Sequence, residues 1–159
     1  MSYITRLVSI ALLFISTNLA FAHDTSVADI RIVHPFATPT APSANVGAVY
    51  LDIDNQGDAA ARLIAARTPR AEVTELHNMT MDNGTMRMFK VDAITVPAGE
   101  TLKMRPKQGY HIMLINLEKP LIKDEKFPLW LSFEGHDEVK VNVWVEEAGS
   151  DNADHHHHH

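Results

Sequence analysis

Histidine and methionine gather in one stretch of this sequence, from His77 to Met113. Six of the seven Met residues lie in it together with two His, and the remaining Met is the first residue of the chain. Thioether sulfur selects Cu(I) and imidazole suits copper well, whereas ions that prefer oxygen ligands make no use of Met. A single Met would more simply be a flexible apolar gap-filler in a core, but His and Met that recur together favour a copper site. The Met residues of the stretch are Met79, Met81, Met86, Met88, Met104 and Met113.

The dipeptide Asn83-Gly84 predicts a β-hairpin in the middle of this stretch. Asn-Gly between alternating residues is the strongest short-range hairpin signal, because a type I′ turn needs φ above zero at both central positions. The hairpin would join a strand over residues 73–81 to a strand over residues 86–91. In that register Met79 stands opposite Met88.

Side chains at alternate positions share a face of a strand, so His77, Met79 and Met81 point the same way. Their cross-strand partners Met88 and Met86 share this face. His77 and Met88 become diagonal neighbours, within reach of long side chains. Geometry alone does not name the ligands among these Met residues, although Met81 and Met86 lie nearest the tip and furthest from His77.

A second His/Met pair, His111 and Met113, lies further along the chain. The two residues are two positions apart, so they face the same side of the strand that we predict over residues 110–117. The hairpin and this strand together offer two imidazoles and several thioethers to one point. The sequence therefore predicts a soft metal site.

The spacing resembles that of the periplasmic copper chaperones of the PCuAC family, whose signature is His, ten residues, Met, twenty-one residues, His, one residue, Met. Ten residues separate His77 from Met88, as in the family. Twenty-two residues separate Met88 from His111, one more than in the family pattern. We expect the surplus residue in the loop over residues 105–109, just before the strand. Met113 then completes the signature.

The resemblance implies a cupredoxin-like fold, an all-β Greek-key antiparallel barrel or sandwich. It also implies a monomeric periplasmic metallochaperone that holds one Cu(I) with His77, Met88, His111 and Met113. The expected partners are a copper-accepting respiratory protein, such as the copper centre of cytochrome oxidase, and another periplasmic copper chaperone. The flanking similarity, over residues 34–131, is less specific than the His/Met signature.

Two other functions stay open. A copper oxidoreductase would need a redox-active copper with an open position, whereas a Met-rich site favours one oxidation state. We recognise no Ser/His/Asp arrangement and no Gly-rich phosphate loop, so we expect no enzyme. An interaction sandwich without metal would use the Met face as an adaptable contact surface, and its partner binding would be indifferent to copper.

The first 22 residues are predicted to be a secretory signal peptide. Arg6 precedes an apolar run over residues 7–15, and Ala20-Phe21-Ala22 forms an A-x-A cleavage site. The run is too short for a membrane-spanning helix, so we expect a periplasmic protein with no stable membrane insertion. Without Arg6, the 14 basic side chains become 13 against 20 acidic ones. This acidic balance argues against nucleic acid as a partner.

The sequence contains no Cys. An exported protein without Cys has no disulfide framework, so its core and sheet must stabilise the fold unaided. The absence of Cys also excludes thiolate metal sites and the Cys ligand of a blue-copper centre. It leaves no side chain for a lipid anchor after the cleavage site.

The C-terminal tail over residues 149–159 is low in complexity and ends in five His. It is either a purification tag or a native metal-capturing segment. Five His is an unusual tag length, and a signal peptide is still present, so we favour a native tail that captures Cu(II) or Zn(II). The residues are His155, His156, His157, His158 and His159.

The segment over residues 23–148 reads as one domain of short strands separated by turn residues, without an apolar period of 3.6 residues. This pattern is typical of an all-β sandwich or barrel. Besides the strands already given, we predict strands over residues 30–33, 46–53, 61–66, 93–96, 101–104, 129–133 and 139–145, with a Pro-rich loop over 35–45.

Overall fold

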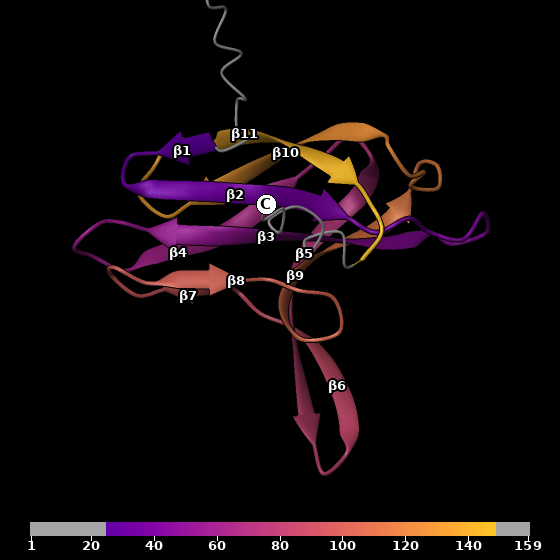
Figure 1. The fold of residues 1–159 in the computed structure, drawn as a ribbon, viewed down its shortest axis with the longest axis horizontal. Helices are drawn as coiled ribbons and strands as arrows, with labels where there is room; N and C mark the ends of the chain where they lie inside the picture. Colours follow the sequence, from indigo (N-terminus) through magenta and orange to yellow (C-terminus); the bar gives the residue numbers. More distant parts are fainter. Residues whose placement is uncertain (1–24, 149–159) are drawn as a thin grey trace, which may run out of the picture.

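The computed structural model describes residues 25–148, which form eleven β-strands and no helix (Figure 1). The predicted signal peptide, over residues 1–22, and the predicted Cu(II)-binding tail, His155–His159, lie outside the described residues. No helix that could cross a membrane is found among residues 25–148. The strands are β1 (Thr25–Val27), β2 (Ile30–Ala37), β3 (Val46–Asn55), β4 (Ala61–Arg67), β5 (Ala71–Asp82), β6 (Thr85–Lys90), β7 (Ile94–Val96), β8 (Thr101–Lys103), β9 (Gly109–Leu117), β10 (Lys126–Phe133) and β11 (Val139–Val145).

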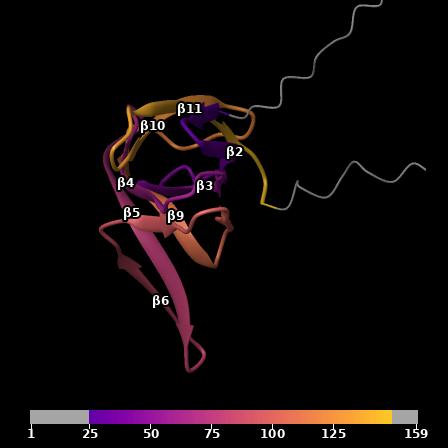
Figure 2. The same cartoon turned by 90° about the vertical axis from the view of Figure 1, so that its left-hand side faces the viewer.

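All eleven strands belong to one sheet in the order β6-β5-β9-β3-β2-β11-β10-β4-β7, with β1 paired to β2 and β8 paired to β3. The sheet folds over on itself, so that β10 and β11 lie across the body from β5 and β9 (Figure 2). The hydroxyl of Thr74 in β5 donates a hydrogen bond to the carbonyl of Ala66 in β4, although these strands are far apart in the sheet order. The predicted all-β class is confirmed.

The core lies between the two sides of the folded sheet and is almost entirely aliphatic and aromatic. Alternate residues of β11, from Val139 to Val145, face it. Met104 also belongs to this core, because its side chain is 0% exposed and its backbone N–H donates to the carbonyl of Leu51. One of the six clustered Met residues is therefore a core residue.

The Pro-rich loop predicted over residues 35–45 begins later than expected, because β2 continues past Pro35. The strand accommodates this residue with a bulge. Pairing with β3 shifts register between Val33 and Phe36, and His34 adopts a φ of 47°. Proline cannot donate to the ladder and is therefore found in sheets at edges and bulges, a position that the sequence pattern did not reveal.

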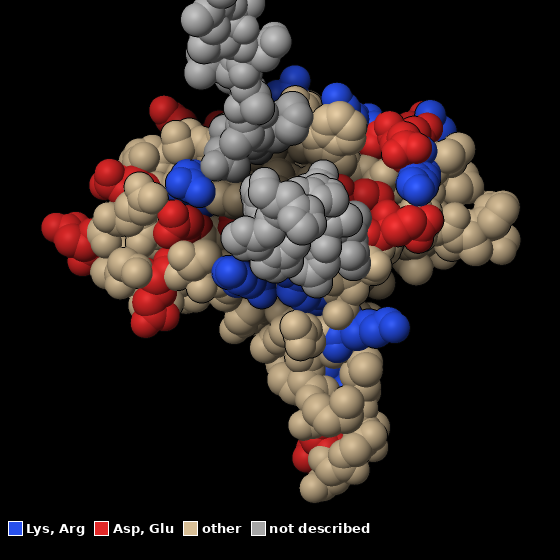
Figure 3. Space-filling model, viewed as in Figure 1, with Lys and Arg blue, Asp and Glu red and all other residues tan. Residues whose placement is uncertain are grey.

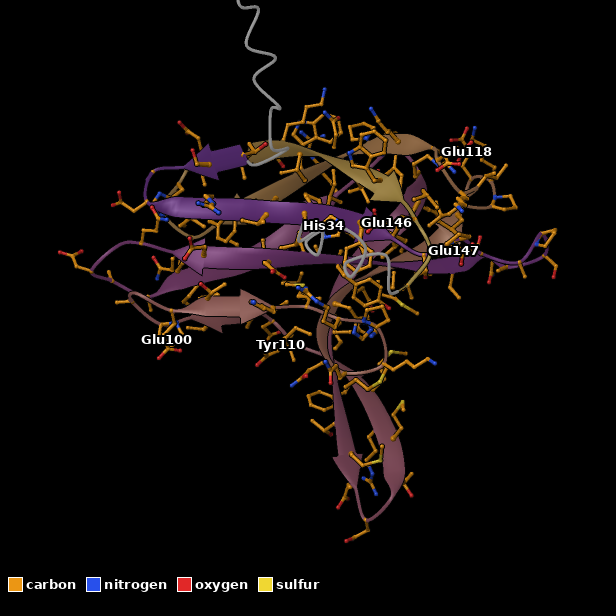
Figure 4. The ribbon with its side chains drawn as sticks, viewed as in Figure 1. His34, Glu100, Tyr110, Glu118, Glu146 and Glu147 are labelled. Carbon is orange, nitrogen blue, oxygen red and sulfur yellow. The ribbon has the colours of Figure 1, made fainter. Side chains whose placement is uncertain are left out.

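One strand pair, β2 with β11, is parallel, whereas the sequence pattern predicted antiparallel neighbours throughout. Phe36 pairs with Trp144, and Ala37 pairs with Val145. The strands are far apart in the sequence, so no hairpin turn imposes an antiparallel direction on them. Beside this pair, Nε2 of His34 lies 2.6 Å from Oε1 of Glu146 (Figure 4).

The hairpin of β5 and β6 projects from the body of the sheet (Figures 1 and 2). Every residue of β6 is exposed. At the tip, Asn83 has a φ of 47° and Gly84 a φ of 78°, the positive values that a type I′ turn requires. The projection is largely uncharged (Figure 3), because only Asp82 and Arg87 carry charge among residues 79–89.

Candidate metal site

The hairpin has the predicted register, with Met79 opposite Met88. On its other side β5 pairs with β9, where His77 stands opposite His111. β5 is thus the middle strand of three, and the topology brings the hairpin and the separate strand onto one layer.

His111 and Met88 meet above β5. They belong to β9 and β6, which flank β5, so two strand spacings of about 4.8 Å separate their backbones. Their side chains bridge this gap, because Nε2 of His111 lies 3.2 Å from Sδ of Met88. The ring of His77, from β5 itself, has its centroid 5.7 Å from that of His111. Two imidazoles and one thioether therefore converge on one face of the layer.

His111 is only 4% exposed, and the centroid of its ring lies 6.2 Å from that of the Tyr50 ring. Its Nδ1 is 3.4 Å from the carbonyl oxygen of Gly109. Burial lowers the pKa of His111, and the neighbouring His77 acts in the same direction against the opposing effect of the Gly109 carbonyl. The imidazole is therefore held in its neutral form, the form that can bind a metal ion.

The two ring nitrogens of His77 have different surroundings. Nε2 lies 2.8 Å from Oε2 of Glu75, whereas Nδ1 is buried and has no hydrogen-bond partner within residues 25–148. The side chain as a whole is 12% exposed. One nitrogen of this ring is thus satisfied, and the other is available to a ligand.

Glu75 and Lys90 belong to this site, and the sequence analysis did not single them out. Oε1 of Glu75 accepts a hydrogen bond of 3.0 Å from Nζ of Lys90. The hydrogen bond with His77, together with that from Lys90, lowers the pKa of Glu75. Glu75 precedes His77 by two residues and so shares its face, and Lys90 is the cross-strand partner of His77 in the predicted register. These two signals could have found both residues.

Met113, the fourth predicted ligand, follows His111 by two positions on β9 and shares its face. It is half-buried, and its backbone stands opposite Glu75. Because His77 stands opposite His111, Met113 is a diagonal neighbour of His77. The structure thus brings all four predicted ligands onto one face of the three strands.

The remaining Met residues of the hairpin are arranged from its base to its tip. Met79 is half-buried next to Met88, whereas Met81 is 66% and Met86 50% exposed at the tip. The structure therefore keeps Met79 close to the site and places the tip pair away from it.

The loop expected to hold the surplus residue is a tight turn directly before β9. Arg105 and Gln108 form an isolated bridge, and Lys107 has a φ of 69°. The strand then begins at Gly109, and His111 faces Met88. The spacing of twenty-two residues is thus compatible with an inward-facing His111.

Across residues 25–148, no three His, Asp or Glu side chains are placed so that they could hold a metal ion together. The thioether of Met88 is the side-chain group that Nε2 of His111 contacts, so a metal ion between His77 and His111 would have sulfur within reach. Neutral imidazole and thioether form a donor set that suits Cu(I) and not Ca²⁺ or Mg²⁺. The residues present fit a soft monovalent cation.

Structures with a similar fold have been solved. The copper-bound PCuAC domain from PmoF2 matches with a TM-score of 0.68 at 24% identity, over 79% of this chain and 98% of that chain. The solution structure of CuI-DR1885 from Deinococcus radiodurans matches with a TM-score of 0.59 at 26% identity, over 80% of this chain and 83% of that chain. The likeness confirms the predicted cupredoxin-like fold.

Sequence comparison identifies the family. The "Putative lipoprotein Lxx21020" of Leifsonia xyli subsp. xyli (strain CTCB07) is 30% identical over 113 residues, which are 70% of this chain and 68% of that protein. The family model described as "Putative lipoprotein LpqE-like" matches residues 30–145, nearly the whole of the described sheet. The chain belongs to the LpqE-like family.

Proposed function

We propose that this protein binds one Cu(I) through His77, Met88, His111 and Met113 and carries it to a copper-accepting protein. The observation behind this proposal is the approach of His111 Nε2 to Met88 Sδ, 3.2 Å apart, beside the ring of His77. The choice of metal is supported by the copper-bound PmoF2 domain and by the Cu(I) form of DR1885, which share the fold.

The ligands suit a carrier because all four are neutral when they bind. No thiol has to lose a proton, so the loaded donor set has only the single charge of Cu(I). The carboxylate of Glu75, hydrogen-bonded to His77, is already paired with the ammonium group of Lys90. Thioether sulfur favours Cu(I), so the site would hold copper in one oxidation state during transport.

The ligands also differ in exposure, which suits stepwise transfer. Met88 is 47% exposed, whereas His111 is 4% exposed. An acceptor that approaches the projecting hairpin would displace the Met88 sulfur first and His111 last. Copper would then keep part of its ligand set until the acceptor supplied replacements.

A Cu(I) titration under reducing conditions tests the assignment. The double variant Met88→Ala/His111→Ala should bind Cu(I) at least about 100-fold more weakly. Loss of a residue that only supports a metal ligand already lowers affinity by up to about 100-fold, and this variant removes two ligands. The matched control Met81→Ala/His136→Ala removes one Met and one exposed His outside the site and should keep the wild-type affinity. Unchanged affinity in the first variant would remove the assignment.

We further propose a monomer in the periplasm, exported by the signal peptide. The family and the relative from Leifsonia xyli are described as lipoproteins, which supports an envelope location, although this sequence has no Cys that could carry a lipid. The proposed acceptor is a respiratory copper centre such as that of cytochrome oxidase, and a second periplasmic copper chaperone is a further partner. A strain without this protein that assembled its full complement of oxidase copper under copper limitation would contradict this role.

We propose a carrier and not an oxidoreductase. The copper-loaded protein should show no steady-state oxidase or reductase turnover. Turnover that His77→Ala abolished would replace the carrier with an enzyme. Partner binding that a copper chelator left unchanged would instead indicate an interaction domain that works without metal.

A further inference from the structure

The two nitrogens of the His77 ring raise a question that the ligand assignment leaves open, namely which of them binds the metal. Nε2 lies 2.8 Å from Oε2 of Glu75. Nδ1 is buried and has no hydrogen-bond partner within the part of the chain that the structure describes. A buried nitrogen without a partner is costly, and such groups in native proteins call for an explanation such as an ion.

The position of Glu75 decides which nitrogen carries the proton. Its carboxylate is held from two sides, by His77 through Oε2 and by Lys90 through Oε1 at 3.0 Å. An ionised carboxylate can only accept hydrogen bonds, so the His77 nitrogen that faces it must be the N–H donor. In neutral imidazole the other nitrogen then carries the lone pair. That nitrogen is the unpartnered Nδ1.

His111 shows the opposite arrangement. Its Nδ1 faces the carbonyl oxygen of Gly109 at 3.4 Å, and its Nε2 faces Sδ of Met88 at 3.2 Å. Both facing atoms can only accept, but the carbonyl oxygen is the stronger acceptor and the thioether a weak one, so Nδ1 is the favoured donor and Nε2 carries the lone pair. The two histidines thus carry their lone pairs on different ring atoms, Nδ1 in His77 and Nε2 in His111.

We propose that Glu75 is a positioning residue that fixes His77 in the Nε2–H tautomer, so that Cu(I) binds His77 through Nδ1 and His111 through Nε2. The metal part of this inference rests on the proposed copper-binding function, and the tautomer part concerns the protein without metal. A carboxylate that accepts the remaining N–H of a ligating His fixes the ring orientation and makes the ligand more basic. Lys90 in turn holds the Glu75 carboxylate in place.

The tautomer is measured first, on the metal-free protein labelled with ¹⁵N in its histidines. Long-range ¹H–¹⁵N NMR spectra distinguish a protonated from an unprotonated ring nitrogen. The wild type should show a single His77 tautomer with the proton on Nε2. Glu75→Ala should show a mixture of the two tautomers, and Glu75→Gln, whose amide oxygen can still accept, should restore most of the wild-type pattern. A wild-type His77 with its proton on Nδ1, or a pattern that Glu75→Ala leaves unchanged, would overturn the proposal.

Copper is added next, as Cu(I) under reducing conditions, which is diamagnetic and keeps the spectra sharp. The ¹⁵N shifts of His77 Nδ1 and His111 Nε2 should move, and Glu75→Ala should lower the Cu(I) affinity by about 10–100-fold without changing the stoichiometry. The control is Glu72→Ala, which removes an exposed carboxylate of the same strand that is bonded to Asn116. It should change neither the tautomer nor the affinity.

The outcomes separate this inference from the proposed function. A shift at Nε2 of His77 in place of Nδ1 would overturn the role of Glu75 while copper binding at the site stood. If Cu(I) shifted the ¹⁵N signals of neither histidine, the proposed function and the Nδ1 assignment would both be overturned. The tautomer of His77 in the metal-free protein would still show whether Glu75 orients the ring.

Discussion

Methionine has different surroundings in the body of the sheet and in the hairpin that projects from it. Met104 is 0% exposed and lies in the aliphatic core. Met88, on β6, is 47% exposed, and its sulfur contacts the imidazole of His111. A Met side chain is thus an apolar filler when its neighbours are aliphatic and a candidate ligand when its neighbours are imidazoles. The strand neighbours of a Met residue, more than its type, therefore indicate its role.

The sharpest test of this comparison concerns the body. Met104→Ala should lower the free energy of unfolding by about 2–5 kcal/mol, because it leaves a cavity in a packed core. The Cu(I) affinity of the folded protein should stay as in the wild type. Urea unfolding of the metal-free protein measures the first effect, with Met86→Ala as the exposed control, expected within about 0.5 kcal/mol of the wild type. Equal stability of the two variants would break the comparison.

Loss of a proposed Met ligand should cause a large change in Cu(I) affinity. Met88→Ala and Met113→Ala should each weaken Cu(I) binding by more than about 10-fold, since each removes a proposed ligand. Met88→Ala should leave the stability of the metal-free protein nearly unchanged, because this side chain is exposed. Competition titration with a Cu(I) chelator measures the affinities, and thermal unfolding measures the stability. A Met88→Ala protein that unfolded as readily as Met104→Ala would make Met88 a packing residue.

A moderate effect concerns pH and the buried His111. Its pKa is lowered in the folded protein by burial, so the unfolded chain takes up this proton at a higher pH than the folded protein does. The contribution of neutral His111 to stability should be fully present above its unfolded pKa of about 6.5 and lost as the pH falls through the folded value. Urea unfolding between pH 8 and pH 5 (about the range of imidazole titration) should show a steeper loss for the wild type than for His111→Gln. Parallel curves would show that His111 is not held neutral by the fold.

The smallest effects are expected along the hairpin itself. Met79→Ala should weaken Cu(I) binding modestly through repacking, because Met79 stands opposite Met88. Met81→Ala and Met86→Ala should leave the equilibrium affinity within about twofold, and should slow only loading or transfer if the tip guides copper to the site. Stopped-flow loading together with equilibrium titration separates these effects. A Met81→Ala protein as weak as Met88→Ala would place the site at the tip.

Much of this site follows from the sequence because local rules determine it. The Asn83-Gly84 turn defines the hairpin register, and the period of two along a strand defines which residues face His77. The turn predicted from residues 82–85 is present with positive φ at both central residues. The sequence predicted that the hairpin and the strand of His111 lie close together. It did not predict that β5 pairs with β9, because the spacing of His111 from the hairpin does not say which strands are neighbours.

The parts that escaped prediction depend on long-range contacts or on residues with ambiguous local signals. Pro35 indicated a loop, but a bulge at His34 lets β2 continue to reach β11. Glu75 looked like one of many scattered acidic residues, because nothing in its own type distinguishes a hydrogen-bond partner of a ligand from a solvated charge. Its position two residues before His77 was the signal available. The parallel direction of β11 beside β2 had no local signal at all.

The exposure of the hairpin sulfurs has a further consequence for chemical durability. Thioether sulfur is oxidised to methionine sulfoxide when oxidants reach it, which turns a soft apolar group into a polar one. Met81, Met86 and Met88 are open to such attack, whereas the enclosed Met104 is shielded. At the proposed copper site, oxidation of Met88 would weaken copper binding while the core around Met104 stayed intact, and a bound copper ion would protect the Met88 sulfur whose lone pair it would occupy. In an oxidising environment, we therefore expect copper binding to be lost through the exposed hairpin sulfurs before the fold itself is lost.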